Sequence, residues 1–216
     1  MMLRGLAGSG LRLGALLRAR PEFASLVTNE LHDWLPGVLA NPQSDLSVYL
    51  RENGFVPAFC VCHMRREGVH FAVPPLPFSP YGDGDYDAVQ ALVSRSFYEL
   101  RRSLGILPHY IAPSDDVRAK YAQNAGDLFL LRQSGRVVGF VTAIGDTLDD
   151  LCVDEEHRGQ GLGAALVMHG VNHILQKGRP AVRLDVIEHN RGALALYRKL
   201  GFTHEFTTYL YRDSGL

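Results

Sequence analysis

Glycines occupy alternate positions in the run His157-Arg-Gly-Gln-Gly-Leu-Gly-Ala-Ala-Leu166, which follows the extended-looking stretch 147–153. Gly159, Gly161 and Gly163 let the main chain turn tightly and let a ligand approach it, because glycine has no Cβ. The apolar helix expected behind them begins with free N–H groups and the positive end of its dipole. The run therefore predicts a site for an anionic group such as a pyrophosphate.

The spacing of these glycines excludes two common phosphate-binding motifs. A P-loop ends in Gly-Lys-Ser/Thr, and a dinucleotide fingerprint has the pattern G-x-G-x-x-G. This chain has G-x-G-x-G instead. Taken alone, the run could also be a glycine-rich turn between a strand and a helix that binds no ligand.

A second patterned segment covers residues 182–202, Val-Arg-Leu-Asp-Val-Ile-Glu-His-Asn-Arg-Gly-Ala-Leu-Ala-Leu-Tyr-Arg-Lys-Leu-Gly-Phe. It consists of an extended β-branched run, then Asn190, then a short helix that ends at Gly201. With the first run it resembles the GNAT superfamily of acetyl-CoA-dependent N-acetyltransferases. The resemblance covers roughly residues 68–216, and two motifs in this order are far more specific than either alone.

The resemblance implies a fold, a co-substrate and a set of site residues. The fold is a mixed-sheet α/β (α+β) GNAT acyl-CoA N-acyltransferase fold, and the co-substrate is acetyl-CoA, with no metal. The patterns R-x-x-G-x-G/A and Asn-x-x-Ala-x-x-x-Tyr match Arg158, Gly161 and Gly163, then Asn190, Ala193 and Tyr197. The implied pyrophosphate contacts are the amides of Arg158, Gly159, Gln160, Gly161, Leu162, Gly163 and Ala164. The implied pantetheine contacts are Leu151, Cys152, Val153 and Asn190, and Ala193 and Tyr197 complete the implied cofactor-binding set.

Tyr197 is our candidate for the general acid that protonates the departing thiolate. Its helical spacing from Asn190 places it on the face of Ala193, looking back toward the preceding strand. Helix position alone favours a core tyrosine whose hydroxyl bonds to a carbonyl, and the acid role rests on the register of Asn190, Ala193 and Tyr197 with the family pattern. Asn190 likewise could serve as a helix cap.

The general base is less clearly marked. A free amine has a pKa near ~10, so a carboxylate must help to remove its proton at neutral pH. Asp149 and Asp150 stand just before the implied pantetheine segment and are the first candidates, while Asp185 and Glu188 lie on the next strand. Each of these acids could instead be solvated or salt-bridged.

The composition limits the classes of function. With 22 Lys and Arg against 23 Asp and Glu, the chain has no basic excess for binding nucleic acid. No apolar run is long enough to cross a bilayer, and the five scattered histidines from His157 to His204 do not suggest a metal site. Three cysteines make no disulfide framework, so we expect them to be reduced in a cytoplasmic protein.

The expected elements place both motifs on one sheet. Helices are expected over 85–102, after Ser114, and from Leu162 to Lys177. A hairpin is expected over 128–144 around Ser134-Gly135, with 147–153 as its third strand, parallel to the strand after the crossover helix. Residues 74–84 are expected to be a linker, and 202–211 a terminal pair of strands.

The first 67 residues are expected to form an N-terminal extension, with the GNAT domain over 68–216. Residues 12–39 have helical periodicity broken by prolines, and 1–20 also suit a transit peptide, although we favour a helix. Gly54-Phe55, Phe59 and Arg65 match Gly201-Phe202, Phe206 and Arg212. This weak repeat suggests the end of a second, truncated GNAT-like unit, or a common helix–Gly–Phe–strand arrangement.

The expected activity is transfer of an acetyl group from acetyl-CoA to a primary amine by direct attack in a ternary complex. The alternatives are a CoA-binding sensor or scaffold without turnover, and an acyltransferase for longer acyl chains. The acceptor, a small molecule or a peptide amine, is expected to contact the variable segment 97–127, and the protein to be a monomer or homodimer.

Overall fold

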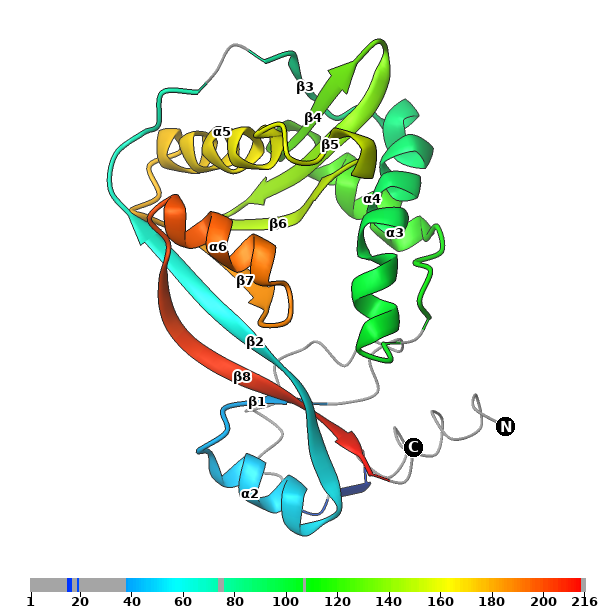
Figure 1. Ribbon diagram of the computed structural model, residues 1–216, viewed down its shortest axis with the longest axis vertical. Coiled ribbons are helices and arrows are strands. Elements are labelled where there is room, and N and C mark those ends of the chain that lie inside the picture. The colour runs from blue at the N-terminus through cyan, green and yellow to red at the C-terminus, as the bar shows by residue number, and fades with distance from the viewer. Residues whose placement is uncertain (1–14, 17–18, 20–37, 74–75, 107, 215–216) are drawn as a thin grey trace. The chain divides into compact units, whose positions relative to one another are not determined.

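The computed structural model describes residues 15–16, 19, 38–73, 76–106 and 108–214 (Figure 1). The principal elements are β1 (Val38–Ala40), α2 (Asp45–Glu52), β2 (Phe55–Glu67), β3 (Phe78–Pro80), α3 (Tyr86–Ser103), α4 (Asp115–Gln123), β4 (Leu128–Gln133), β5 (Arg136–Ile144), β6 (Thr147–Val153), α5 (Leu162–Gln176), β7 (Ala181–Ile187), α6 (Arg191–Lys199) and β8 (Thr203–Asp213). They form two compact units: unit 1 contains 1–63, 186–190 and 205–216, and unit 2 contains 64–185 and 191–204.

Unit 2 is built on a sheet with the strand order β7-β6-β5-β4-β3. Strands β3 to β6 pair antiparallel, whereas β6 and β7 pair parallel. The β4–β5 hairpin turns at Ser134 and Gly135, which both have positive φ. The mixed α/β sheet, the hairpin and the parallel crossover expected from the sequence are confirmed.

Helices cover the two faces of this sheet (Figure 1). On one face, a Cβ added to Gly139 in β5 would lie 2.9 Å from Leu166 of α5. On the other face, the neighbouring Phe140 packs in a cluster with Leu92 of α3 and Tyr121 of α4. Since successive strand residues point to opposite faces, α5 and the α3–α4 pair lie on opposite sides.

The helix α5 packs very closely on β6. A Cβ at Gly170 would lie 2.5 Å from Cδ2 of Leu148, which is 3% exposed. Only glycine at position 170 allows the helix to come this close to the strand. The packing gained by this close approach offsets the low helix propensity of glycine.

Unit 1 has its own small core. Strand β1 pairs antiparallel with β8, which is the neighbour of β2 in the sheet. Ser44 caps α2, because its Oγ accepts the N–H of Ser47 at 3.2 Å. Leu46, Leu50, Phe55 and Tyr211 pack together as the buried cluster.

The helix–Gly–Phe–strand order occurs twice in the chain. Gly54 (φ 80°) and buried Phe55 connect α2 to β2, while Gly201 (φ 83°) and buried Phe202 connect α6 to β8. The two segments thus share the element order that the weak repeat requires. That residues 1–67 descend from a truncated second unit stays a proposal.

Several expectations differ from the structure. Residues 203–213 form one continuous strand rather than a pair, because this run contains no turn-forming Gly, Pro or Asn. Leu39 lies in β1 rather than in a helix, and β3 falls inside the expected linker. Ser114 precedes α4 without a side-chain cap; instead, the hydroxyl of Tyr86 bonds its N–H and C=O, both at 2.8 Å.

The remaining N-terminal expectations lie mostly outside the described residues. Ala15, Leu16 and Ala19 are helical, and the question of a transit peptide over 1–20 lies outside the described part. None of the described helices is both long and apolar enough to pass through a bilayer.

Candidate functional site

The glycine run forms a loop between β6 and α5 in unit 2. Gly159 and Gly161 have φ angles of 77° and 81°, so both adopt the left-handed region that glycine favours. Gly161 is the residue that precedes the first turn of α5. Gly163 has ordinary φ, and a Cβ there would lie 3.5 Å from Leu196 of α6. The backbone conformation therefore requires Gly159 and Gly161, as expected from the sequence, but not Gly163.

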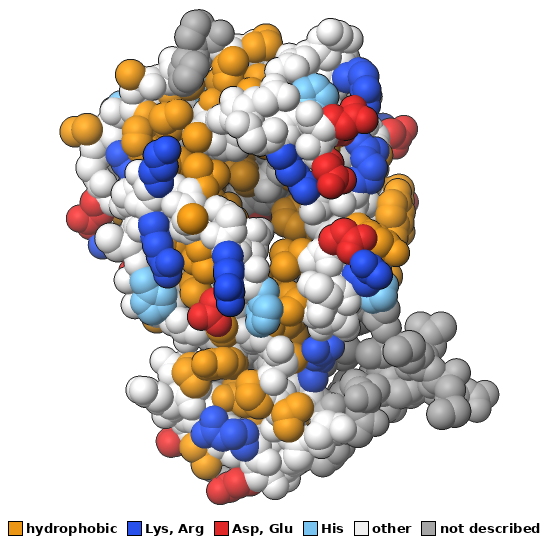
Figure 2. Space-filling view, in the orientation of Figure 1, with side chains coloured by type: hydrophobic (Ala, Val, Ile, Leu, Met, Phe, Trp, Pro, Cys, Tyr) orange, Lys and Arg blue, Asp and Glu red, His pale blue; other side chains and the backbone are white. Residues whose placement is uncertain are grey.

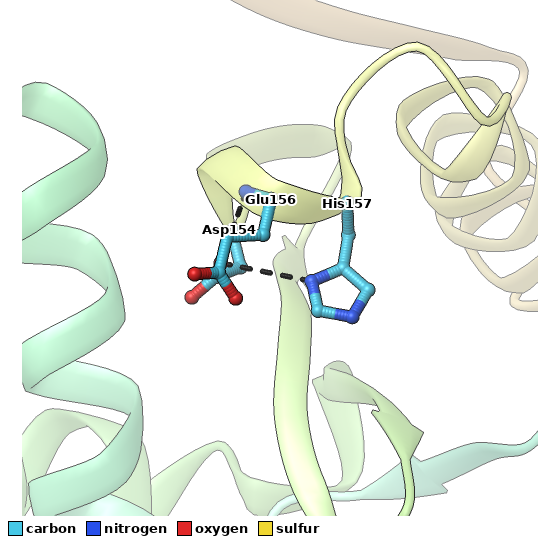
Figure 3. A group of neighbouring side chains, drawn as sticks. All are labelled: Asp154, Glu156 and His157. Carbon is cyan, nitrogen blue, oxygen red and sulfur yellow. Dashed lines mark hydrogen bonds and ion pairs between the residues drawn. The ribbon is translucent and has the colours of Figure 1, made fainter.

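Asp154 ties this loop to the body of unit 2. Its Oδ1 accepts the N–H of Glu156 at 3.3 Å, and its Oδ2 accepts from Nη2 of Arg95 in α3 at 3.3 Å. Figure 3 shows the carboxylate also turned toward Nδ1 of His157, 3.6 Å away. Burial alone would raise the pKa of Asp154, but these partners outweigh it and lower the pKa below its ordinary value.

The ligand atoms of Asp154, Glu156 and His157 lie within 4.8 Å of one another. Such a group could in principle hold a cation. The oxygens of Asp154, however, are already engaged by a main-chain N–H and by Arg95. We therefore interpret Asp154, Glu156 and His157 as residues that hold the loop in place, rather than as a cation site.

Strands β6 and β7 separate immediately before this loop. Their parallel ladder contains only the pairs Thr147–Arg183 and Leu148–Leu184. Beyond Leu148, β6 forms no further pair with β7 in the described sheet, although β6 continues through Leu151, Cys152 and Val153. A strand edge of this kind offers main-chain donors and acceptors to an extended ligand.

Tyr197 of α6 is buried, at 7% exposure, and its ring packs edge-on against Phe202. Its hydroxyl forms no hydrogen bond with any residue that the structure describes. Burial, and secondly the charge of Asp149, raise the pKa of Tyr197 to about 12. The phenol is therefore protonated at neutral pH, as a proton donor must be.

Asp149 and Asp150 lie at a β-bulge of β6. The β5–β6 register shifts between the pairs Phe140–Cys152 and Thr142–Asp149, and Asp150 has φ 50°. The bulge separates the two carboxylates: Asp149 is exposed, whereas Asp150 is partly buried and accepts the hydroxyl of Tyr121 at 2.8 Å. Burial, and secondly the charge of Asp149, raise the pKa of Asp150 to about 6.

Other candidates occupy different positions. Asp185 is exposed on β7. Glu188 belongs to unit 1, where its carboxylate accepts the thiol of Cys60 at 2.8 Å. Asn190 also belongs to unit 1, directly before α6, and its N–H donates to the carbonyl of Ile187 at 2.8 Å. Ala193 lies in α6 with Tyr197.

Charges of both signs surround the loop. The guanidinium of Arg158 bends back, with Nε donating to the carbonyl of Val153 at 3.3 Å. A pocket beside the loop is lined by Arg95, Arg136, Arg158, Asp154, Glu155, Glu156, Leu92 and Ser96. Figure 2 shows basic and acidic side chains interspersed on the visible face, rather than gathered into one basic patch.

Two residues of the site were missed in the sequence. Arg95 contacts the loop, and Tyr121 contacts the bulge, from α3 and α4 respectively. Nothing in their local sequence marks them, because helical periodicity accounts equally well for both. Only the tertiary packing of these helices on the sheet reveals their partners.

Comparison with known proteins identifies the family. Residues 92–202, more than half of the chain, match the sequence model of the Acetyltransferase (GNAT) family. The matched range contains β6, the glycine loop, α5 and Tyr197. The chain belongs to the GNAT family.

Individual relatives are similar over parts of their length. A mycothiol acetyltransferase of Thermomonospora curvata is 37% identical over 107 residues, covering 46% of this chain and 36% of the relative. A [ribosomal protein bS18]-alanine N-acetyltransferase of Escherichia coli is 35% identical over 89 residues, covering 38% of this chain and 60% of the relative. The chain thus spans about a third to three fifths of the length of these two proteins.

Solved structures support the fold. A GCN5-related N-acetyltransferase from Sphaerobacter thermophilus has a TM-score of 0.62 at 21% identity, covering 82% of this chain and 59% of that one. A GNAT-family acetyltransferase from Colwellia psychrerythraea has the same TM-score at 13% identity, covering 82% and 65%.

Proposed function

We propose that the chain transfers an acetyl group from acetyl-CoA to a primary amine, by direct attack within a ternary complex. The observation that carries this proposal is the separation of β6 from β7 after two residue pairs, directly before a glycine loop at the start of α5. An open strand edge that leads to a helix N-terminus suits a long, partly peptide-like ligand with a pyrophosphate at one end.

Main-chain groups supply most of the binding in this proposal. The amides of residues 158–164 hold the pyrophosphate, and the β6 edge at Leu151–Val153 pairs with the pantetheine arm. The unpaired edge and the two left-handed glycines fit this group. Bound acetyl-CoA supplies the activated thioester. Ala193 and Tyr197 of α6 complete the proposed binding set within unit 2.

The side chains have separate tasks in the transfer. The amine nitrogen attacks the thioester carbonyl, the new C–N bond forms, and the C–S bond breaks. Tyr197 donates its phenolic proton to the sulfur as negative charge develops there. Asp150 takes the proton that the amine loses, through water, since a pKa of about 6 keeps it deprotonated at neutral pH. Asp149 is the second candidate for this role.

The names of the two relatives give two kinds of acceptor. One is named for a small molecule, mycothiol, and the other for the alanine of a ribosomal protein. We propose an amine acceptor that approaches from the α3–α4 side, where Asp150 and Tyr121 lie. The three free, buried cysteines fit the cytoplasmic setting that we propose, and we propose that the protein acts as a monomer or homodimer.

Calorimetry with CoA and acetyl-CoA, followed by an amine panel with thiol release as the readout, tests the proposal. The panel includes small amines and peptides that begin with alanine. Binding together with acceptor-dependent thiol release is the expected result. Binding of CoA without thiol release from any amine would support the non-catalytic CoA sensor. Thiol release only from a longer acyl-CoA would support an acyltransferase for longer acyl chains. Absence of CoA binding would overturn the acetyltransferase and both alternatives.

A further inference from the structure

Tyr121 and Asp150 form a hydrogen bond that has no role in the reaction steps proposed above. Tyr121 is in α4 and is 2% exposed; its hydroxyl donates to Oδ2 of Asp150 at 2.8 Å. The Tyr121 ring lies among aromatic side chains, with centroid distances of 5.7 Å to Tyr81, 6.4 Å to Tyr86 and 5.5 Å to Phe140. The phenol therefore has a fixed place relative to the sheet.

The carboxylate at the other end of this bond is held in an uncommon backbone conformation. Asp150 is one of two described non-glycine residues with positive φ, and it lies at the bulge of β6. Its N–H donates to Oδ1 of Asp149 at 2.8 Å. This left-handed conformation is uncommon inside a strand, and it turns the Asp150 side chain out of the regular alternation of β6. β-bulges also commonly re-aim a side chain beside an active site.

We propose that Tyr121 is a positioning residue, which holds Asp150 as an oriented carboxylate at the bulge of β6, ready to accept the proton of the amine. This inference rests on the proposed function for its catalytic meaning. The contact itself, however, can be tested without turnover.

The electrostatic consequence has a definite sign. Burial and the charge of Asp149 raise the pKa of Asp150, while the hydrogen bond from Tyr121 and the charge of Lys120 oppose this rise. Cys152, two residues further along β6, is a buried thiol whose pKa burial raises, so it is neutral at physiological pH. Removal of the Tyr121 hydroxyl should therefore raise the pKa of Asp150 further.

The aromatic cluster provides two matched control variants. The hydroxyl of Tyr81 is buried without a hydrogen-bond partner among the described residues, so Tyr81→Phe removes an oxygen that bonds to nothing there. The hydroxyl of Tyr86 bonds the main chain of Ser114, so Tyr86→Phe removes structural bonds that do not reach Asp150. Neither variant takes away the partner of the carboxylate.

The experiment is a carboxyl ¹³C NMR titration of the full chain, with the Asp150 signal assigned by its loss in Asp150→Asn. Tyr121→Phe should raise the pKa of Asp150 by about one pH unit, the scale of a hydrogen bond to a charged group. Tyr81→Phe should leave the pKa in place, and Tyr86→Phe should lower the melting temperature without moving the pKa. An unmoved pKa in a folded Tyr121→Phe protein would overturn the proposal.

Kinetics separate this inference from the proposed function. In an active enzyme, the acidic limb of kcat/KM for the amine should move to higher pH in Tyr121→Phe, while the affinity for CoA by calorimetry stays within about twofold. Absence of CoA binding in the wild type would sink the proposed function but leave the NMR titration valid. A limb that moves equally in Tyr86→Phe would reduce Tyr121 to a structural residue.

Discussion

Arg95 in α3 and Asp154, the residue directly after β6, form an ion pair, with Nη2 3.3 Å from Oδ2. Asp154 also binds the main chain of the glycine loop through Glu156. One side chain thus connects the helix on the proposed acceptor side to the loop on the proposed phosphate side. The position of the loop depends on α3, which the local glycine pattern does not reveal.

Asp154→Asn should weaken the binding of acetyl-CoA by roughly fivefold, or about 1 kcal/mol, because the loop loses a charged anchor that is partly exposed at Arg95. Calorimetry measures the change. Asp146→Asn is the matched control, since Asp146 forms an ion pair with Arg183 away from the loop. Equal losses of affinity in both variants would contradict the anchoring role.

Gly161→Ala should reduce both stability and the affinity for acetyl-CoA. A side chain at φ 81° costs about 1 kcal/mol of unfolding free energy, although a Cβ would meet no atom within 4 Å. Gly178→Ala places the same strain (φ 77°, open space) beyond the other end of α5. The two variants should lose similar stability in denaturant titrations, and only Gly161→Ala should lose affinity.

Tyr197→Phe should lower kcat by roughly 10²-fold, the scale of a lost general acid. The KM for acetyl-CoA should change little, because the ring still packs against Phe202. Steady-state kinetics with saturating amine provide the measurement. Undiminished turnover would remove Tyr197 from the reaction.

The pH dependence follows from the pKa of Asp150, which is raised to about 6. A base must be deprotonated, so kcat/KM for the amine should fall about tenfold for each pH unit below that value. Asp149→Asn removes a neighbouring charge that raises this pKa, and should therefore move the limb to lower pH. Complete loss of turnover in Asp149→Asn would instead assign the base to Asp149.

The sequence predicted the parts of the fold that depend on local pattern. Strand β6, the glycine loop and the Asn190–Tyr197 spacing were located by alternation, turn chemistry and motif register. The expectation of two terminal strands was wrong, because Thr203–Asp213 contains no Gly, Pro or Asn at which the chain could turn. The contacts of Arg95 and Tyr121 could not be predicted, since each joins elements that are far apart along the chain.

The close approach of α5 to β6 is another feature that periodicity does not predict. Gly170→Ala would place a methyl group 2.5 Å from Cδ2 of Leu148, so the variant should lose about 1–3 kcal/mol of unfolding free energy by overpacking. Gly192→Ala, also in a helix, meets no atom within 4 Å and should be neutral or slightly stabilising. Urea titrations of both proteins compare the two outcomes, and equal stability would show that Leu148 moves aside freely.

The short ladder between β6 and β7 has an evolutionary consequence. Every amino acid except proline presents the same peptide group, so a surface built from peptide groups can keep its chemistry while side chains drift. The fold itself is shared with a solved structure at 21% identity. Selection for a new acceptor can then act on α3 and α4, apart from the Arg95 contact with Asp154, without changing the main chain that we propose binds the donor.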